Sequence, residues 1–186
     1  GNRSTMRIST LDTTLRDGAQ GCGISFSLRD KEQIIYLLDE LGIDIIEAGN
    51  PAASPKDAEL LSSRFSLTHA RLAAFGATRR KDCATKDDPA LAALGACNAD
   101  IAVIFGKCSL TACREVIRTT PEENLRMISQ SVEYLLSCGK EVIFDAEHFF
   151  DSFNENPDYA LNCLMAAQSA GAAQVCLCDT CGGTLP

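Results

Sequence analysis

The chain alternates short apolar runs with longer amphipathic stretches, and this alternation limits its fold more than any other feature of the sequence. Six runs are short, continuously apolar and rich in Val, Ile and Phe, as strands buried on both faces are. They cover residues 7–11, 43–49, 70–76, 100–106, 141–147 and 173–180. Strands that alternate with helices form βαβ units, so the sequence predicts an α/β protein with a parallel sheet.

Five helices are expected between these strands, because each intervening stretch carries start or stop signals. In the clearest case Thr120 caps the helix, Pro121 occupies its first turn, Glu123 closes a capping box and Gly139 ends it. Its buried stripe is expected to hold Leu125, Ile128, Val132, Leu135 and Leu136. The other four helices are expected to begin near Ser27, Ser54, Asp87 and Asn156.

Right-handed crossovers allow a parallel sheet of this kind to be either an open doubly wound sheet or a closed barrel. The glycines at 18, 21 and 23 do not have the G-x-G-x-x-G spacing of a dinucleotide-binding open sheet. We therefore predict a TIM (β/α)8-type barrel. The barrel is incomplete in this sequence, which contains about six strands and five helices.

The bulk properties exclude several classes of partner. A chain of 186 residues, 46% hydrophobic and 23% charged, is expected to form one globular domain. A net charge of −8 and a pI near 4.7, without a Lys/Arg cluster, argue against binding to nucleic acid or an anionic membrane. The sequence also lacks an apolar run of roughly 18 residues, the length that spans a bilayer.

The ten cysteines are scattered and lie mostly within apolar segments. This is typical of reduced thiols, so we expect a cytoplasmic protein. Cys176, Cys178 and Cys181 form a C-x-C-x-x-C pattern that can hold zinc or an iron–sulfur cluster, but no second cysteine pair accompanies it. We interpret these three as buried structural residues. Residues 1–6 are expected to be a disordered or artificial leader, and residues 7–186 the domain.

Polar side chains follow nearly every predicted strand. In chain order they are Asp12, Arg16 and Asp17; Glu47 and Asn50; Thr78, Arg79 and Arg80; Lys107; Asp145, Glu147 and His148; Asp179 and Thr180. The carboxyl ends of parallel strands meet on one rim, where active sites of α/β proteins lie. Clustered carboxylates suit Mg²⁺ or Mn²⁺. A metal beside an arginine suits an oxyanion forming on a carbonyl, so the rim predicts carbon–carbon chemistry on an oxo acid.

Five motifs carry a family resemblance over residues 8–186: "DTTLRDGAQ", "IIEAGNP", "FGATRR", "FDAEHFFD" and "LCDTCGGTLP". Together they resemble the acyl-CoA-condensing members of the DRE-TIM metallolyase superfamily, which are the 2-isopropylmalate, homocitrate and citramalate synthases. The citramalate branch is the most similar. The resemblance implies that residues 7–186 are the N-terminal portion of an HMGL-like (pyruvate carboxyltransferase-type) catalytic barrel.

The resemblance also implies roles for single residues. Asp17 would bind the metal, which is Mg²⁺ or Mn²⁺ with Zn²⁺ as an alternative. Arg16 would hold the oxygen of the 2-oxo acid and steady the charge formed there, and Glu147 corresponds to the catalytic glutamate. Thr180 would bind the substrate carboxylate, and Glu47 is also placed among the substrate-binding residues.

The implied reaction condenses acetyl-CoA with pyruvate or 2-oxoisovalerate, giving citramalate or 2-isopropylmalate in branched-chain amino-acid biosynthesis. The resemblance implies a homodimer. The family's His-x-His metal ligands are missing, since the sequence holds only His69 and His148, and Cys181 replaces a common asparagine. We therefore expect this chain alone to be inactive.

Three alternatives stay open at this point. The chain can belong to a 3-hydroxyacyl-CoA lyase or aldolase of the same superfamily, or it can be a non-catalytic partial barrel that serves as an assembly module. Lys107, Arg79 and Arg80 can attract the phosphates of CoA or can be solvated loop charges. Asp12 can cap a turn or take part in the site.

Overall fold

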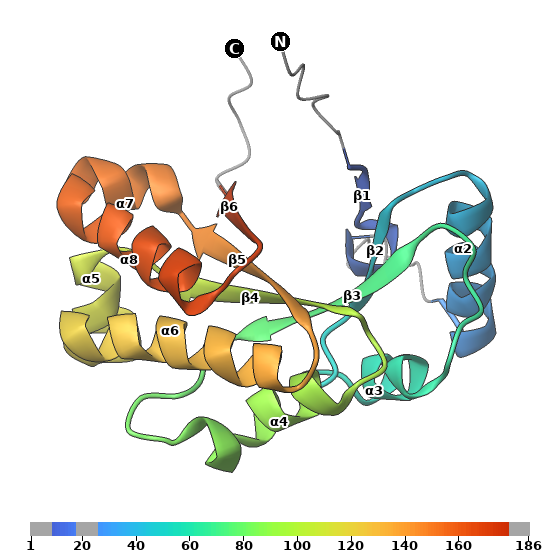
Figure 1. Cartoon of the computed structure of the whole chain (residues 1–186), viewed down its shortest axis with the longest axis horizontal. Coiled ribbons are helices and arrows are strands. Elements are labelled where there is room, and N and C mark those ends of the chain that lie inside the picture. The colour runs from blue at the N-terminus through green and yellow to red at the C-terminus, as the bar shows by residue number, and fades with distance from the viewer. Residues whose placement is uncertain (1–8, 18–25, 179–186) are drawn as a thin grey trace, which may run out of the picture.

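The computed structural model describes residues 9–17 and 26–178, with Arg16 and Asp17 as backbone only. One parallel sheet contains six strands in the order β1-β2-β3-β4-β5-β6. They are β1 (Leu11–Asp12), β2 (Ile45–Gly49), β3 (Arg71–Ala77), β4 (Ile101–Lys107), β5 (Glu141–Glu147) and β6 (Gln174–Cys178). Because the strands follow one another without a reversal, the order is that of a barrel and not of a doubly wound sheet. The predicted incomplete barrel is confirmed (Figure 1).

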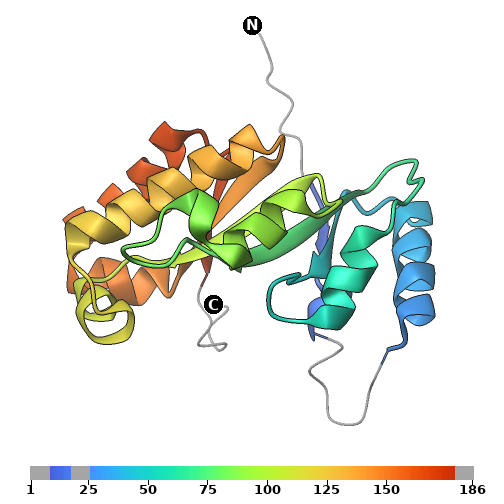
Figure 2. The ribbon, with the colours of Figure 1, turned by 90° about the horizontal axis from the view of Figure 1, so that it is seen from below.

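The five predicted helices are all present. They are α2 (Leu28–Glu40), α3 (Pro55–Ser62), α4 (Pro89–Ala96), α6 (Pro121–Ser137) and α8 (Pro157–Ala170). Ser27 and Asp30 form a full capping box at the start of α2, and Asn156 accepts a hydrogen bond from the Tyr159 amide at the start of α8. Helices α2 and α3 lie beside the first strands, while α6 and α8 lie toward the other edge of the sheet (Figures 1 and 2).

Two details of α6 differ from the prediction. Thr120 does accept a hydrogen bond from the Glu123 amide, but the Glu123 carboxylate binds Arg79 instead of completing the capping box. Leu136 is 37% exposed, and the buried face of α6 contains Asn124, Met127 and Ser131 beside the expected aliphatic residues. The helix therefore buries polar groups that serve the loops at the carboxyl end of the sheet.

Short helical turns that the sequence did not predict follow three of the strands at their carboxyl ends. They are α1 (Thr14–Asp17) after β1, α5 (Leu110–Ala112) with the π-helical turn η3 (Cys113–Ile117) after β4, and α7 (Phe149–Glu155) after β5. A 3₁₀ turn, η2 (Thr85–Asp87), precedes α4. Each is too short to show a helical period in the sequence. These turns build the walls of the carboxyl end of the sheet.

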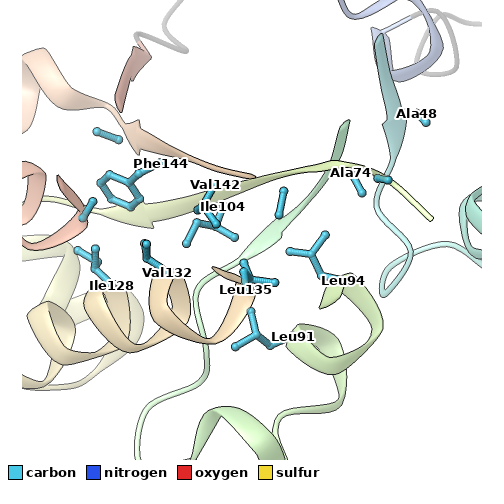
Figure 3. Packing of buried hydrophobic residues seen from close by; sticks show 14 of the residues in the cluster. Ala48, Ala74, Leu91, Leu94, Ile104, Ile128, Val132, Leu135, Val142 and Phe144 are labelled. Carbon is cyan, nitrogen blue, oxygen red and sulfur yellow. The ribbon is translucent and has the colours of Figure 1, made fainter. Parts of the chain in front are cut away.

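Apolar side chains are buried on both faces of the inner strands, as the apolar runs predict, whereas the edge strands β1 and β6 leave Leu11, Val175 and Leu177 exposed. On the outer face Ile104, Val142 and Phe144 meet α6, whose residues Ile128, Val132 and Leu135 face them (Figure 3). The inner face carries a smaller cluster made of Ile45, Ala73, Ile101, Val103 and Ile143. Residues alternate between the two clusters along each strand because the side-chain period of a strand is two.

Candidate site at the carboxyl ends of the strands

The predicted site residues fall into two groups. Glu47 lies in β2 and Glu147 ends β5, so the structure places both within the sheet as expected. The backbone of Arg16 and Asp17 follows β1 at its carboxyl end, but their side chains lie outside the described part of the chain, as does all of Thr180.

An ion pair stands at the ends of β4 and β5. Lys107 and Glu147 are direct neighbours in the parallel register, and their side chains lie on the inner face. The Lys107 Nζ atom is 2.7 Å from Glu147 Oε2, and the two side chains are 29% and 25% exposed. The pair is thus partly shielded from water but still reachable by a small molecule.

The inner face becomes acidic just below this pair. Asp145 lies in register with Phe105 on one side and Cys176 on the other, and Glu47 is only 3% exposed. Burial raises the pKa of the Cys176 thiol, and the charges of Asp145 and Glu47 raise it further. Carboxylates from β2 and β5 therefore reach the same part of the interior, next to β6.

Two clefts meet at the Lys107–Glu147 pair. The first, of about 490 Å³, has Phe105, Ile117 and Met127 in its lining and the loop 77–81 along its edge. The second, of about 340 Å³, runs between α5 and α7 past Ser109 and His148. Both clefts are lined by Lys107 and Glu147. The pair therefore stands where the two clefts join, within reach of a molecule in either one.

Arg79 is neither a free cation nor a solvated loop charge. It is 4% exposed, its Nε donates to Gln130 Oε1 at 2.9 Å, and its guanidinium pairs with Glu123. Its backbone amide donates to Ser131 Oγ at 2.9 Å. The Arg79 guanidinium holds the pKa of the Glu123 carboxyl below its usual range. Arg79 therefore clamps the loop after β3 onto α6, a role the sequence did not reveal.

The remaining candidates have simpler roles. Asp12 Oδ1 accepts a hydrogen bond from the Thr14 amide at 2.8 Å, which caps the turn that begins α1. His69 lies at the amino end of β3 and its Nε2 is 2.7 Å from Asp44 Oδ1, as a structural histidine would be. His148 has a left-handed backbone (φ +50°) at the start of α7 and lines the cleft between α5 and α7.

The described residues do not form a metal centre by themselves. No group of three or more His, Cys, Asp or Glu side chains among residues 9–15 and 26–178 is arranged to hold an ion. The side chain of Asp17, the predicted ligand, lies outside these ranges. In the same part of the chain no helix is long and apolar enough to cross a membrane.

Six parallel strands paired in chain order, with helices between them, place the chain in the class of (β/α)-barrel proteins. The chain belongs to the HMGL-like family, whose model matches residues 7–186.

The chain is 48% identical to the (R)-citramalate synthase of Sulfolobus acidocaldarius over 184 residues, which cover 98% of this chain and 35% of that protein. It is 47% identical to the (R)-citramalate synthase of Aquifex aeolicus over 97% of this chain and 34% of that protein. A homocitrate synthase and a 2-isopropylmalate synthase match at 31% and 32% identity. The chain thus spans about a third of the length of the curated relatives it matches.

Among solved structures, the HMG-CoA lyase of Bacillus subtilis superposes with a TM-score of 0.69 at 18% identity. The match covers 95% of this chain and 58% of that one. At this level of identity the likeness supports the barrel fold and carries no argument about activity.

Proposed function

We propose that the chain forms part of an acyltransferase that condenses acetyl-CoA with pyruvate to give (R)-citramalate. Two observations support this. Glu147 stands at the junction of two clefts on the rim where barrel enzymes hold their substrates, and this is the observation that carries the proposal. The choice of pyruvate rests on the 47–48% identity to (R)-citramalate synthases, against 31–32% for the homocitrate and isopropylmalate synthases.

In this proposal Glu147 is the general base. Its carboxylate takes a proton from the methyl group of acetyl-CoA, and the resulting enolate carbon bonds to C2 of pyruvate while the C2 carbonyl oxygen becomes an alkoxide. The alkoxide takes up a proton, and water then cleaves the thioester to release CoA. Arg16 would stabilise the charge on the pyruvate oxygen, Thr180 would bind the pyruvate carboxylate, and Glu47 would line the substrate site.

The metal ligands present in the sequence bear on whether the 186-residue chain is active by itself. Asp17 would supply one ligand to a divalent ion, Mg²⁺ or Mn²⁺ with Zn²⁺ as the alternative, and its histidine partners are not found as a His-x-His pair in the sequence. We propose that the isolated chain makes no citramalate. The homodimer and the cytoplasmic location stay predictions.

A graft tests the proposed function. Residues 7–186 replace the matching segment of the Sulfolobus acidocaldarius (R)-citramalate synthase, and CoA release is followed with acetyl-CoA and each of three oxo acids: pyruvate, 2-oxoisovalerate and 2-oxoglutarate. We expect activity that is highest with pyruvate. A second graft with the Aquifex aeolicus segment controls for compatibility of the two parts.

Two results would contradict the proposal. One is a folded but inactive graft beside an active Aquifex control. The other is cleavage of a 3-hydroxyacyl-CoA in place of condensation, which would support the lyase alternative.

A further inference from the structure

We propose that Lys107 is a positioning residue for Glu147, and that Asn124 in turn fixes the backbone from which Lys107 projects. The catalytic consequence rests on the proposed function, whereas the positioning itself is a statement about this chain's structure.

The contact between Lys107 and Glu147 is direct. The 2.7 Å separation of Lys107 Nζ and Glu147 Oε2 is that of a charge-assisted hydrogen bond, and it engages one oxygen of the carboxylate. A glutamate at the end of a strand has several side-chain torsions to be ordered, and a fixed partner removes much of that freedom. Because solvent-accessible ion pairs contribute little to stability, the pair is better explained by placement of the carboxylate than by folding.

The end of β4, from which Lys107 projects, is itself held in place. Asn124 is fully buried in α6, and its Nδ2 donates to the Lys107 carbonyl oxygen at 2.9 Å and to Tyr159 Oη at 3.1 Å. Tyr159 Oη itself donates to the Pro121 carbonyl at 2.9 Å, which links α8 to α6. The last residue of β4 is therefore held by a polar network that spans two helices.

This network is an unfavourable way to fill a core. Asn124 Oδ1 is buried and finds no hydrogen-bond partner in the described ranges. A buried acceptor without a partner destabilises the fold, so an apolar residue would be more stable here if packing were the whole purpose. An amide at this position is explained by its two bonds, to the Lys107 carbonyl and to Tyr159, which connect the end of β4 to α6 and α8.

The other cations at this end of the sheet have different contacts. Arg79 is committed to Glu123 and Gln130, and Lys81 Nζ donates to the Arg118 carbonyl at 2.8 Å. Within the described residues, Lys107 is the cation that the structure pairs with Glu147.

The experiment compares two lysines that differ in their place in the fold. Lys107→Met removes the ammonium group beside Glu147. Lys140→Met is the matched control, because Lys140 Nζ donates to the Cys97 and Ala99 carbonyls just before β4 begins, at the opposite end of the sheet. Lys107→Arg is the conservative variant. Crystal structures of the 186-residue variants report the Glu147 side chain, and the same variants in the active graft report kinetics.

In Lys107→Met we expect the Glu147 carboxylate to leave its position. We also expect kcat to fall about 10- to 100-fold, as misplacement of a reacting group by about 1 Å does. KM for pyruvate is expected to change by less than about twofold, since the lost contact orders a reacting group and does not bind substrate. Lys107→Arg should restore part of kcat, and Lys140→Met should leave both Glu147 and kcat unchanged.

The crystal structures test whether Lys107 positions Glu147, and the kinetics test whether Glu147 acts in catalysis. An unmoved Glu147 in the Lys107→Met crystal structure overturns the positioning role, whatever the kinetics. Loss of kcat in Lys140→Met equal to that in Lys107→Met also overturns it, because the effect would then be general destabilisation. A displaced Glu147 with unchanged kcat supports the positioning role and contradicts the catalytic role of Glu147 in the proposed function.

Discussion

The two ends of the sheet differ in where their charged side chains lie relative to the clefts. At the amino end Asp39 binds backbone: it accepts hydrogen bonds from the amides of Thr68, His69 and Ala70, which precede β3. Lys140 donates to two carbonyls that precede β4 in the same manner. At the carboxyl end Lys107 and Glu147 bind each other across two open clefts. The amino end also contains the ion pairs Arg71–Glu141 and His69–Asp44, so the carboxyl end is distinguished by a pair in which both partners line two clefts at once.

The two ends also show that the size of a cleft does not mark a site. The amino end has a cleft of about 520 Å³ against residues 67–72, larger than either cleft at the carboxyl end. Two of the polar residues in its lining are already engaged, Arg71 by Glu141 and His69 by Asp44. In a barrel this end of the strands is the one associated with stability.

The largest expected effect compares two glutamates that lie at opposite ends of the same strand, β5. Glu147 ends β5 and Glu141 begins it, and both are paired with a cation from another strand. In the active graft, Glu147→Gln should lower kcat by about 100- to 10,000-fold, the contribution typical of a general base, with unfolding unchanged. Glu141→Gln should leave kcat near that of the parent graft. Comparable losses of kcat in the two variants would show that catalysis does not depend on the carboxyl end of the sheet more than on the amino end.

Arg79 lies at the carboxyl end of the sheet, yet it holds a loop in place, as Asp39 and Lys140 do at the amino end. Removing one partner of a buried ion pair is strongly destabilising, but Arg126 Nη2 stays 3.5 Å from Glu123 Oε2, so Arg79→Met should lower the free energy of unfolding toward the low end of about 3–5 kcal/mol. Arg80→Met is the control, since Arg80 is the next residue of the same loop and its side chain is exposed. Urea unfolding followed by circular dichroism measures both. Equal stability of the two variants would mean that the clamp does not stabilise the fold.

The fold was largely predictable from local signals. The predicted limits of β5, residues 141–147, are correct at both ends, and Gly139 marks the end of the helix before it. Four of the five main helices were found because Ser27, Ser54, Thr120 and Asn156 mark their starts as caps. The short turns α1, α5 and α7 were missed, since three to seven residues contain too little periodicity to detect.

The position of the candidate site in the fold was predictable from the sequence, but the contacts between its side chains were not. Glu47 and Glu147 could be assigned to one rim because parallel strands all end there. The partner of Glu147 lies far earlier in the chain, and only the register of β4 with β5 brings Lys107 beside it. The partner of Arg79 is similarly distant in sequence, so its role as a clamp depends on how α6 crosses the sheet. Register and helix placement are tertiary properties that no motif in this sequence encodes.

The smallest expected effect is a pH dependence at the amino end. Three backbone amides lower the pKa of Asp39 to about 2, below its ordinary value of 3.8. A depressed carboxyl pKa stabilises the fold above the unfolded-state value, and this stability is lost as the pH falls from about 4 through 2. Asp39→Asn should therefore be less stable at neutral pH, because the amide nitrogen cannot accept from the Thr68–Ala70 backbone, and its stability should fall less between pH 5 and 2.

Asp82→Asn, at an exposed turn, is the matched control and should keep the acid dependence of the parent chain. Thermal unfolding of all three proteins between about pH 7 and 2 measures the difference, since that range spans both the unfolded-state and the folded-state pKa of Asp39. Parallel curves for the parent and Asp39→Asn would mean that the amino-end loops are held by something other than this carboxylate. A steeper acid dependence in Asp39→Asn would reverse the sign of the contribution of Asp39 to stability and would show that its bonds to the backbone before β3 do not stabilise this end of the sheet.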